Sequence, residues 1–219
     1  MTPLRDIAMS GAPLARAKAV TVLLHGRGAS AESMLALAEP LAQPDLACIA
    51  PQAPGGSWYP YSFLAPITQN EPHLSRSLAT VGDLLTTLSA QGFNTDRVIL
   101  LGFSQGGCLA LEYAARNARR YGGVIGLSAG LIGPEGTPRD YHGSLAGTPT
   151  FLGCSNIDGH IPLNRVQESS RMLRGLGGDV VERIYPGLGH TINEDELRHV
   201  RGILADLLQP TSITAAGRS

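Results

Sequence analysis

The chain has few of the residues that support disulfide or metal-based folds. Its 219 residues include three cysteines, Cys48, Cys108 and Cys154, which are widely spaced and form no C-x-x-C pair. An odd number of widely spaced cysteines argues against a disulfide framework and against a cysteine-ligated metal. We expect Cys48 and Cys108 to be small core residues, and we predict a reducing, cytoplasmic setting with no cofactor and no metal.

The chain also has no excess of positive charge and no long apolar run. Seventeen Lys and Arg oppose 18 Asp and Glu, for a net charge of -1, and Lys18 is the single lysine. Without a basic cluster we expect no nucleic-acid partner. The N-terminus lacks the apolar stretch of a secretory signal, and no apolar run is long enough for a membrane span. We therefore predict no stable membrane insertion.

What the chain does contain is a regular alternation of two patterns. Hydrophobic residues make up 43% and charged residues 16%, which is typical of a globular protein. Short apolar runs, the predicted strands, alternate with amphipathic stretches, as in a doubly wound parallel sheet covered on both faces. The predicted strands are 19–26, 46–51, 97–103, 122–128, 148–154 and 179–185. This predicts a mostly parallel α/β fold.

The amphipathic stretches predict helices, and the clearest two lie at 74–88 and 197–207, where Leu and Val recur every three or four residues. The second has a start signal, Asn193 followed three residues later by Glu196. The first twelve residues show a weak strand pattern. We predict one domain over residues 1–219, with 210–219 as a loose tail.

Two connections are longer than a strand–helix unit requires, residues 52–71 and 129–147. Loops of this length are usually functional or disordered. Both follow predicted strands, so both are expected at the carboxyl edge of the sheet, where open α/β sheets bind ligands. Neither is long enough to suggest a large lid.

The stretch VILLGFSQGGCLAL places a serine between a strand and a helix with no spacer. Such a turn is sharp, and Gly102 and Gly106 leave room for the backbone to cross itself, while Gly107 permits tight helix–strand packing. Ser104 would then project above the sheet. The N–H of Gln105, at the positive end of the helix, is aimed at the same space. This arrangement predicts a nucleophile beside an oxyanion donor.

A serine nucleophile needs a base, and His190 is the best candidate. It lies in the glycine-rich YPGLGHT after the last predicted strand, at the carboxyl edge. The other histidines have other expected places: His25 as a structural hydrogen bonder, His73 and His142 in loops after earlier strands, His160 at the rim of the site, and His199 on the surface of the last helix.

The acid that orients the histidine should follow a strand and lie between serine and histidine in the chain. Asp158, in SNIDGHIP, meets both conditions. Asp140 also emerges at the carboxyl edge and is the alternative. Asp96 precedes a predicted strand and Asp179 begins one, so both are expected at the amino edge, the wrong side.

A second oxyanion donor is expected from the loop after the first clear strand, which reads HGRGAS. The backbone N–H of Arg27 is the predicted donor. We expect its guanidinium to be solvated, with contact to an acidic group on a substrate as the alternative.

Together these motifs resemble the phospholipase/carboxylesterase family of α/β-hydrolases, which includes acyl-protein thioesterases and small bacterial carboxylesterases. The resemblance runs from VLLHGRGAS through LGFSQGG and SNIDGHIP to YPGLGHTINEDEL. It implies a triad of Ser104, Asp158 and His190, with the amides of Arg27 and Gln105 as oxyanion hole. It also allows a homodimer, which no sequence feature requires.

The sequence departs from the thioesterase pattern at two places. GGSWYPYSFLAP replaces a Trp-Phe-Asp motif, and HGRG replaces HGLG. These departures favour the bacterial esterase branch over depalmitoylation of proteins. The expected function is a serine carboxylesterase for short-to-medium chain esters. Thioesterase, lysophospholipase and lactone hydrolase activities on the same triad are alternatives, as is a binding protein without catalysis.

The loop at 52–71 is also rich in apolar rings that could line an acyl pocket. The alternative is that these rings merely anchor the loop to the core. Tyr61 is one of these rings, and the candidate substrate-binding residues are Trp58, Tyr59, Phe63 and Leu64.

Overall fold

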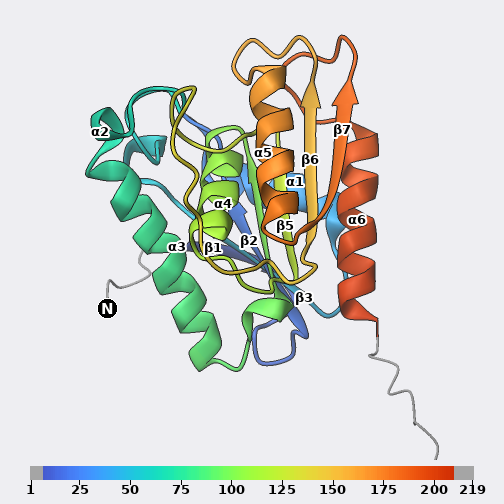
Figure 1. The fold of residues 1–219 in the computed structure, drawn as a ribbon. Helices are drawn as coiled ribbons and strands as arrows, with labels where there is room; N and C mark the ends of the chain where they lie inside the picture. The colour runs from blue at the N-terminus through green and yellow to red at the C-terminus, as the bar shows by residue number, and fades with distance from the viewer. Residues whose placement is uncertain (1–6, 210–219) are drawn as a thin grey trace, which may run out of the picture.

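The structure is a computed structural model that describes residues 7–209. Within these residues the chain forms a seven-stranded sheet in the order β1-β3-β2-β4-β5-β6-β7 (Figure 1). The strands are β1 (Ile7–Gly11), β2 (Ala19–Leu24), β3 (Leu46–Pro51), β4 (Val98–Phe103), β5 (Gly123–Leu127), β6 (Pro149–Ser155) and β7 (Asp179–Tyr185). The six strands from β2 to β7 correspond to the six predicted strands.

The helices are α1 (Ala31–Ala38), α2 (Ile67–Asn70), α3 (His73–Ala90), α4 (Gln105–Arg116), α5 (Leu163–Gly175) and α6 (Glu194–Leu208). The helices predicted at 74–88 and 197–207 are therefore confirmed as α3 and α6. Asn193 caps α6 and exchanges the expected reciprocal hydrogen bonds with Glu196. One prediction was wrong: His73 is the first residue of α3 and not part of a loop.

Strand pairing makes the sheet parallel except at one edge. β2 pairs with β4 in parallel, with Val20 opposite Val98, and the parallel ladder continues through β5, β6 and β7. β1 runs antiparallel to β3, with Ile7 opposite Pro51. This is the weak strand expected near the N-terminus. The predicted tail at 210–219 lies outside the described residues.

Side chains alternate between the two faces of the sheet, as strand geometry requires. Val20, Val22 and Leu24 of β2 pack into the core beneath α3, α4 and α5. Ala19 and Leu23 of the same strand pack toward α1 and α6. Figure 1 shows the first group of helices in front of the sheet and α1 behind it. The predicted doubly wound architecture is confirmed.

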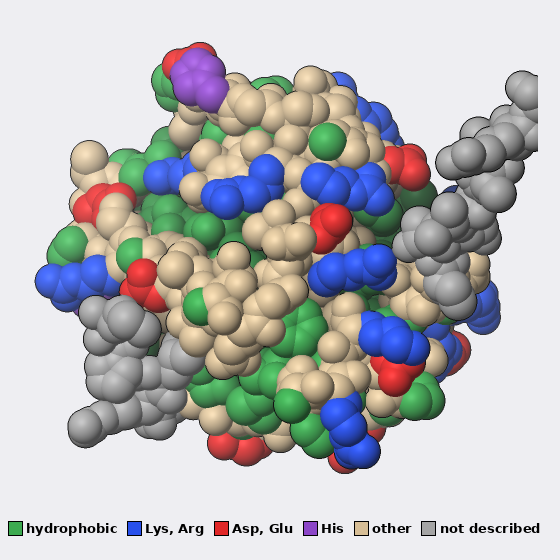
Figure 2. All heavy atoms as spheres, turned by 90° about the horizontal axis from the view of Figure 1, so that it is seen from below, with side chains coloured by type: hydrophobic (Ala, Val, Ile, Leu, Met, Phe, Trp, Pro, Cys, Tyr) green, Lys and Arg blue, Asp and Glu red, His purple; other side chains and the backbone are tan. Residues whose placement is uncertain are grey.

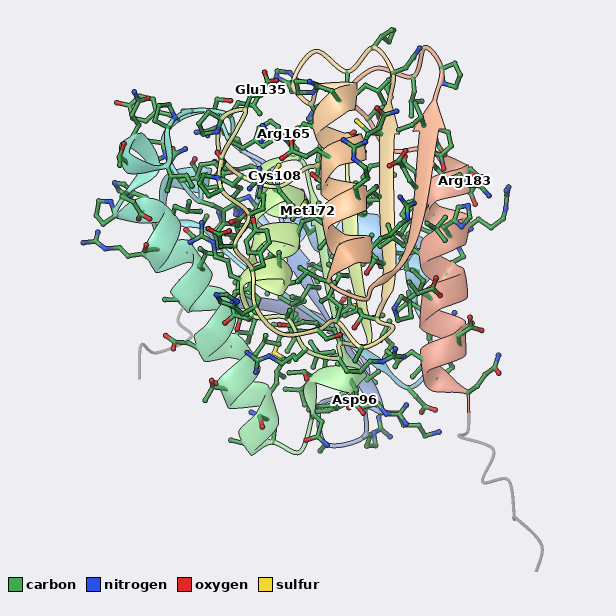
Figure 3. The ribbon with its side chains drawn as sticks, in the orientation of Figure 1. Asp96, Cys108, Glu135, Arg165, Met172 and Arg183 are labelled. Atoms are coloured by element: carbon green, nitrogen blue, oxygen red, sulfur yellow. The ribbon has the colours of Figure 1, made fainter. Side chains whose placement is uncertain are left out.

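The parallel strands all point to one end of the molecule, which carries the long loops. The loop at 52–71 contains only a 3₁₀ turn (Pro54–Gly56) and the single turn of α2, and 129–147 contains no helix or strand. Figure 2 looks onto the opposite end, where Lys and Arg side chains are interspersed with Asp and Glu. Asp96 lies at that lower end in Figure 3, as predicted from its place before β4.

Among the described residues, none of the helices combines the length and the apolar composition that crossing a lipid bilayer requires.

Candidate active site

The turn between β4 and α4 holds Ser104 in a strained backbone conformation. Its φ is 54° and its ψ is -120°, in a region that non-glycine residues rarely adopt. Ser104 N–H donates to the carbonyl of Leu127 at 2.9 Å, and Ser104 C=O accepts from Cys108 N–H at 2.9 Å. Backbone bonds to the neighbouring strand and to the helix thus hold the serine in this conformation.

The glycines around Ser104 are required by close backbone contacts. A Cβ on Gly102 would lie 2.3 Å from the carbonyl of Gly106, and one on Gly106 would lie 2.1 Å from the carbonyl oxygen of Leu24. A Cβ on Gly107 would lie 2.7 Å from that of Ala129. The sequence argument for these glycines agrees with the observed packing.

Three side chains from different loops form a hydrogen-bonded chain above this turn. His190 Nε2 lies 2.9 Å from Ser104 Oγ, and His190 Nδ1 lies 2.7 Å from Asp158 Oδ2. An ionised carboxylate can only accept, so Nδ1 carries the proton and Nε2 accepts from the serine hydroxyl. The structure thus brings together the serine, histidine and aspartate singled out in the sequence.

The Asp158 carboxylate is fully buried and well supplied with donors. Oδ1 accepts from the backbone N–H groups of His160 and Ile161 at 2.8 and 3.0 Å. Burial alone would raise the pKa of Asp158, but the hydrogen bonds from His190 and from these two N–H groups outweigh it, so the pKa is lowered. Asp158 therefore stays ionised at neutral pH.

Asp140, the alternative acid, does not reach this site. It borders a different cavity, together with Glu112, Arg116 and Arg139. The carboxyl-edge rule allowed both aspartates, and only the packing of the loops separates them.

Hydrogen bonds join the loop that carries Asp158 to the loop that carries His190, so that the two side chains meet. Gly187 N–H donates to the side chain of Asn156 at 2.9 Å, and Gly189 N–H donates to Ser155 Oγ at 3.0 Å. The rings of His160 and Phe103 lie 4.7 and 5.0 Å from the ring of His190. His160 thus lies beside His190 and borders the cavity, consistent with its expected place at the rim.

Two backbone N–H groups are available beside the serine. Gln105 is the first residue of α4 and Arg27 lies in the HGRG turn. In the described part of the chain, neither N–H donates to a protein acceptor. They are the two donors predicted from the sequence.

His25 supports the turn that carries Arg27. Its Nδ1 donates to the carbonyl of Gly26 at 2.8 Å, and its Nε2 accepts from Ala53 N–H at 3.0 Å. Burial lowers the pKa of His25, so the ring is neutral and can hold both bonds. This is the structural role predicted for it.

The side chains of Arg27 and Gln105 are tied to the loop at 52–71. Arg27 donates to Ser57 Oγ at 2.9 Å, to the carbonyl of Pro60 at 2.8 Å and to that of Tyr61 at 2.6 Å. Arg27 is exposed, as expected, but these three hydrogen bonds also anchor its guanidinium to the loop. Gln105 accepts from Trp58 N–H at 3.0 Å and donates to the carbonyl of Tyr59 at 2.8 Å.

A cavity of about 590 Å³ opens beside Ser104 and His190. Tyr59 and Phe63 line it, as predicted, whereas Trp58 and Leu64 do not. Trp58 is 3% exposed, and its indole N–H donates to the carbonyl of His25 at 2.8 Å. This tryptophan anchors the loop instead of lining the cavity.

Sequence reasoning missed several residues of the cavity wall. Cys108 was expected only in the core, but it lies one helical turn beyond Ser104 and so faces the same side of α4 (labelled in Figure 3). The i, i+4 spacing was the signal that could have found it. Burial raises the pKa of the Cys108 thiol to about 12, so it does not compete with Ser104 as a nucleophile. Tyr61, another ring of the loop at 52–71, also lines the cavity. The other missed lining residues are Gly26, Ala29, Pro60, Ser62, Phe103 and Ile161.

Among residues 7–209, no group of three or more His, Cys, Asp or Glu side chains is arranged to hold a metal ion.

A sheet of this topology, with a strained serine between a strand and a helix and a histidine and an aspartate on later loops, is of the α/β-hydrolase type. The sequence model of the phospholipase/carboxylesterase family matches residues 10–208. The chain belongs to this family.

Known proteins of the same kind agree. The structure of a phospholipase/carboxylesterase from Dyadobacter fermentans is 46% identical, with a TM-score of 0.88, covering 91% of this chain and 96% of that one. Esterase PE8 is 27% identical, with a TM-score of 0.79, covering 93% and 99%. Acyl-protein thioesterase 1 of Gibberella zeae is 33% identical over 124 residues, 54% of this chain and 52% of that protein. The match thus spans about half the length of this curated relative.

Proposed function

We propose that the protein is a serine carboxylesterase that hydrolyses short-to-medium chain esters through an acyl-enzyme. The observation that carries the proposal is the chain of hydrogen bonds from Ser104 through His190 to Asp158, beside two unused backbone N–H groups. Nucleophile, base, orienting acid and oxyanion donors are the parts that acyl transfer requires.

In the first half of the reaction, Ser104 Oγ attacks the acyl carbon while His190 Nε2 takes the hydroxyl proton. The carbonyl oxygen becomes an oxyanion, which the N–H groups of Arg27 and Gln105 stabilise. Asp158 holds the imidazolium through Nδ1–H. As the tetrahedral intermediate collapses, the bond to the alcohol breaks, and Nε2–H returns the proton to the leaving oxygen.

In the second half, water attacks the acyl-serine, and His190 again takes the proton. The same two N–H groups hold the second oxyanion, and Ser104 regains its proton as the carboxylic acid leaves. Asp158 remains an anion throughout, in keeping with its lowered pKa.

Size and lining of the cavity support substrates of modest length. About 590 Å³ is within the range of small-ligand pockets, and apolar rings from Tyr59, Phe63 and Phe103 form much of the wall. No large insertion covers the cavity, since residues 52–71 contain only a 3₁₀ turn and the short α2. We therefore expect no jump in rate at an oil–water interface.

A thioester substrate is the second candidate, because the resemblance to acyl-protein thioesterase 1 of Gibberella zeae favours it. Oxyesters and thioesters pass through the same kind of oxyanion, so the site geometry serves both. A panel of matched oxyesters and thioesters of graded acyl length separates the two by kcat/KM.

The decisive test is Ser104→Ala. We expect activity to fall by at least about 10³-fold, because the nucleophile is gone and only oxyanion stabilisation and binding remain. Fluorophosphonate labelling should occur on wild type and disappear in the variant, with circular dichroism unchanged. Labelling that persists, or more than a few per cent residual activity, rejects Ser104 as nucleophile. Failure of wild type to label at all favours a binding protein instead.

A further inference from the structure

The cavity beside Ser104 carries one uncompensated positive charge. Arg27 borders it, and among the described residues no Asp, Glu or Lys does so. The carboxylate of Asp158 lies behind His190 and is fully buried. The cavity therefore presents a cation, apolar rings and no anion to a substrate.

Counting the donors of Arg27 shows that it is only partly engaged. A guanidinium has five N–H groups. Three are used: Nη1 donates to Ser57 Oγ and to the carbonyl of Pro60, and Nη2 donates to the carbonyl of Tyr61. All three acceptors are neutral, and no described carboxylate lies within 4.0 Å of Arg27.

The two donors that remain are Nε–H and the second hydrogen of Nη2. Nε and Nη2 flank one edge of the planar group, which is the fork that fits a carboxylate with two parallel hydrogen bonds. The loop carbonyls already fix the orientation of the guanidinium, and its carbon lies 5.9 Å from the centre of the Tyr59 ring. Little side-chain entropy is then lost when an anion binds.

The position of Arg27 in the chain links this fork to the reacting centre. Its backbone N–H is a proposed oxyanion donor, and Arg27 borders the same cavity as Ser104. An anionic group on an ester bound in this cavity would therefore lie next to a cation.

We infer that the preferred substrates are esters that carry a carboxylate, which Arg27 binds through its free edge. This inference rests on the proposed function and names its substrate class. The carboxylate can belong to the acyl part, as in a monoester of a dicarboxylic acid, or to the alcohol part, as in an ester of a hydroxy acid.

The test uses isosteric pairs in which an amide replaces the carboxylate. Monomethyl glutarate against methyl glutaramate probes the acyl part, and acetoxyacetate against acetoxyacetamide probes the alcohol part. In wild type, kcat/KM should be about tenfold or more higher for the charged member in one of the two pairs, since hydrogen bonds to charged groups are the stronger kind. Which pair responds tells where the carboxylate sits.

Arg27→Met should abolish that preference and lower kcat/KM for the charged member far more than for the amide. Ser57→Ala is the matched control, because it removes one acceptor of Arg27 and keeps the charge; both members should then fall together. Raising the salt concentration should shrink the wild-type preference and leave Arg27→Met unaffected.

Equal kcat/KM within both pairs in wild type overturns the inference, and this needs no variant that might alter folding. An equal loss on both members in Arg27→Met also overturns it and leaves Arg27 as an anchor of the loop. Either result leaves the esterase proposal intact, since fluorophosphonate labelling of Ser104 and hydrolysis of the neutral esters test that separately.

Discussion

The two long loops of the carboxyl edge are anchored to the same helix by different chemistry. Gln105 at the start of α4 holds the loop at 52–71, and Glu112, two turns further on, holds the loop at 129–147. Both side chains are buried, at 6% and 1% exposed. One anchor is a neutral amide and the other is a carboxylate.

Glu112 is surrounded by partners. It accepts from Ile132 N–H at 2.9 Å and from Tyr141 O–H at 3.1 Å, and it forms an ion pair with Arg116 at 2.7 Å. Arg139 lies 3.7 Å away. A buried carboxylate is tolerated when it is paired and hydrogen-bonded in this way.

The difference between the two loops shows that a loop of unusual length is not necessarily part of the site. Residues 52–71 supply much of the cavity wall, whereas none of residues 129–147, all of which are described, borders that cavity. The neutral anchor is the one beside the cavity, so the anchor itself adds no negative charge near the developing oxyanion. The charged anchor is placed two turns away, where it serves packing.

The largest effect is expected at the charged anchor. Glu112→Ala leaves Arg116 without its carboxylate, Arg139 with Glu168 alone, and the Ile132 N–H without its acceptor. We expect a loss of about 3–5 kcal/mol in the free energy of unfolding, measured by urea denaturation. The kcat/KM on a neutral ester should change little. A loss below about 1 kcal/mol contradicts the role of Glu112 as an anchor.

Gln105→Ala should have the reverse pattern of effects: a large loss of catalysis and a smaller loss of stability. The backbone N–H stays, but the loop at Trp58 and Tyr59 loses its amide partner and the oxyanion donors lose a support. We expect kcat to fall about 10–100-fold, less than the loss of a donor itself. Stopped-flow or steady-state kinetics measures this. A change confined to KM means that the amide supports substrate binding alone.

Within the loop at 52–71, variants of a cavity-wall residue and of an anchoring residue should have different effects. Phe63 borders the cavity and Trp58 does not, so Phe63→Ala should shift the acyl-chain profile of p-nitrophenyl esters by about tenfold between chain lengths. Trp58→Phe removes the hydrogen bond to the carbonyl of His25. It should lower stability and leave the acyl-chain profile parallel to that of wild type. A shifted profile in Trp58→Phe reverses this division.

The smallest effect concerns Glu196, a buried carboxylate like Asp158 and Glu112. It lacks the partners that Glu112 has. Oε2 accepts from Asn193 N–H at 2.8 Å, but Oε1 has no partner among the described residues. Burial raises the pKa of Glu196 from 4.5 to about 7, despite the bond from Asn193. Between these pH values the folded protein keeps a proton that the unfolded chain has released, so stability falls as pH rises through this window.

Glu196→Gln should therefore flatten the dependence of Tm on pH between about 5 and 8, because the glutamine cannot ionise. At the upper end the variant should melt a few degrees higher than wild type, about 2–4 °C per kcal/mol for a chain of this size. Thermal unfolding at several pH values measures this. Identical slopes in both proteins assign the pH dependence to other groups.

Local patterns in the sequence predicted the elements around the site well. The strand, turn and helix around Ser104 follow from apolar periodicity and from glycines whose Cβ atoms would collide with backbone a few residues away or on the next strand. The start of α6 follows from Asn193 and Glu196, which are three residues apart. The chain order of serine, aspartate and histidine then limited the candidates to two acids and one base.

What only the tertiary structure decided depends on side chains far apart in the chain. Asp158 rather than Asp140 meets His190, Trp58 packs behind the wall that Tyr59 and Phe63 form, and the guanidinium of Arg27 binds a loop more than thirty residues away. A periodic pattern encodes which face of an element is apolar, because that depends on neighbours within a turn or strand. It does not encode which loop carbonyl meets which donor, because that is set when separate elements pack together and every buried polar group must find a partner.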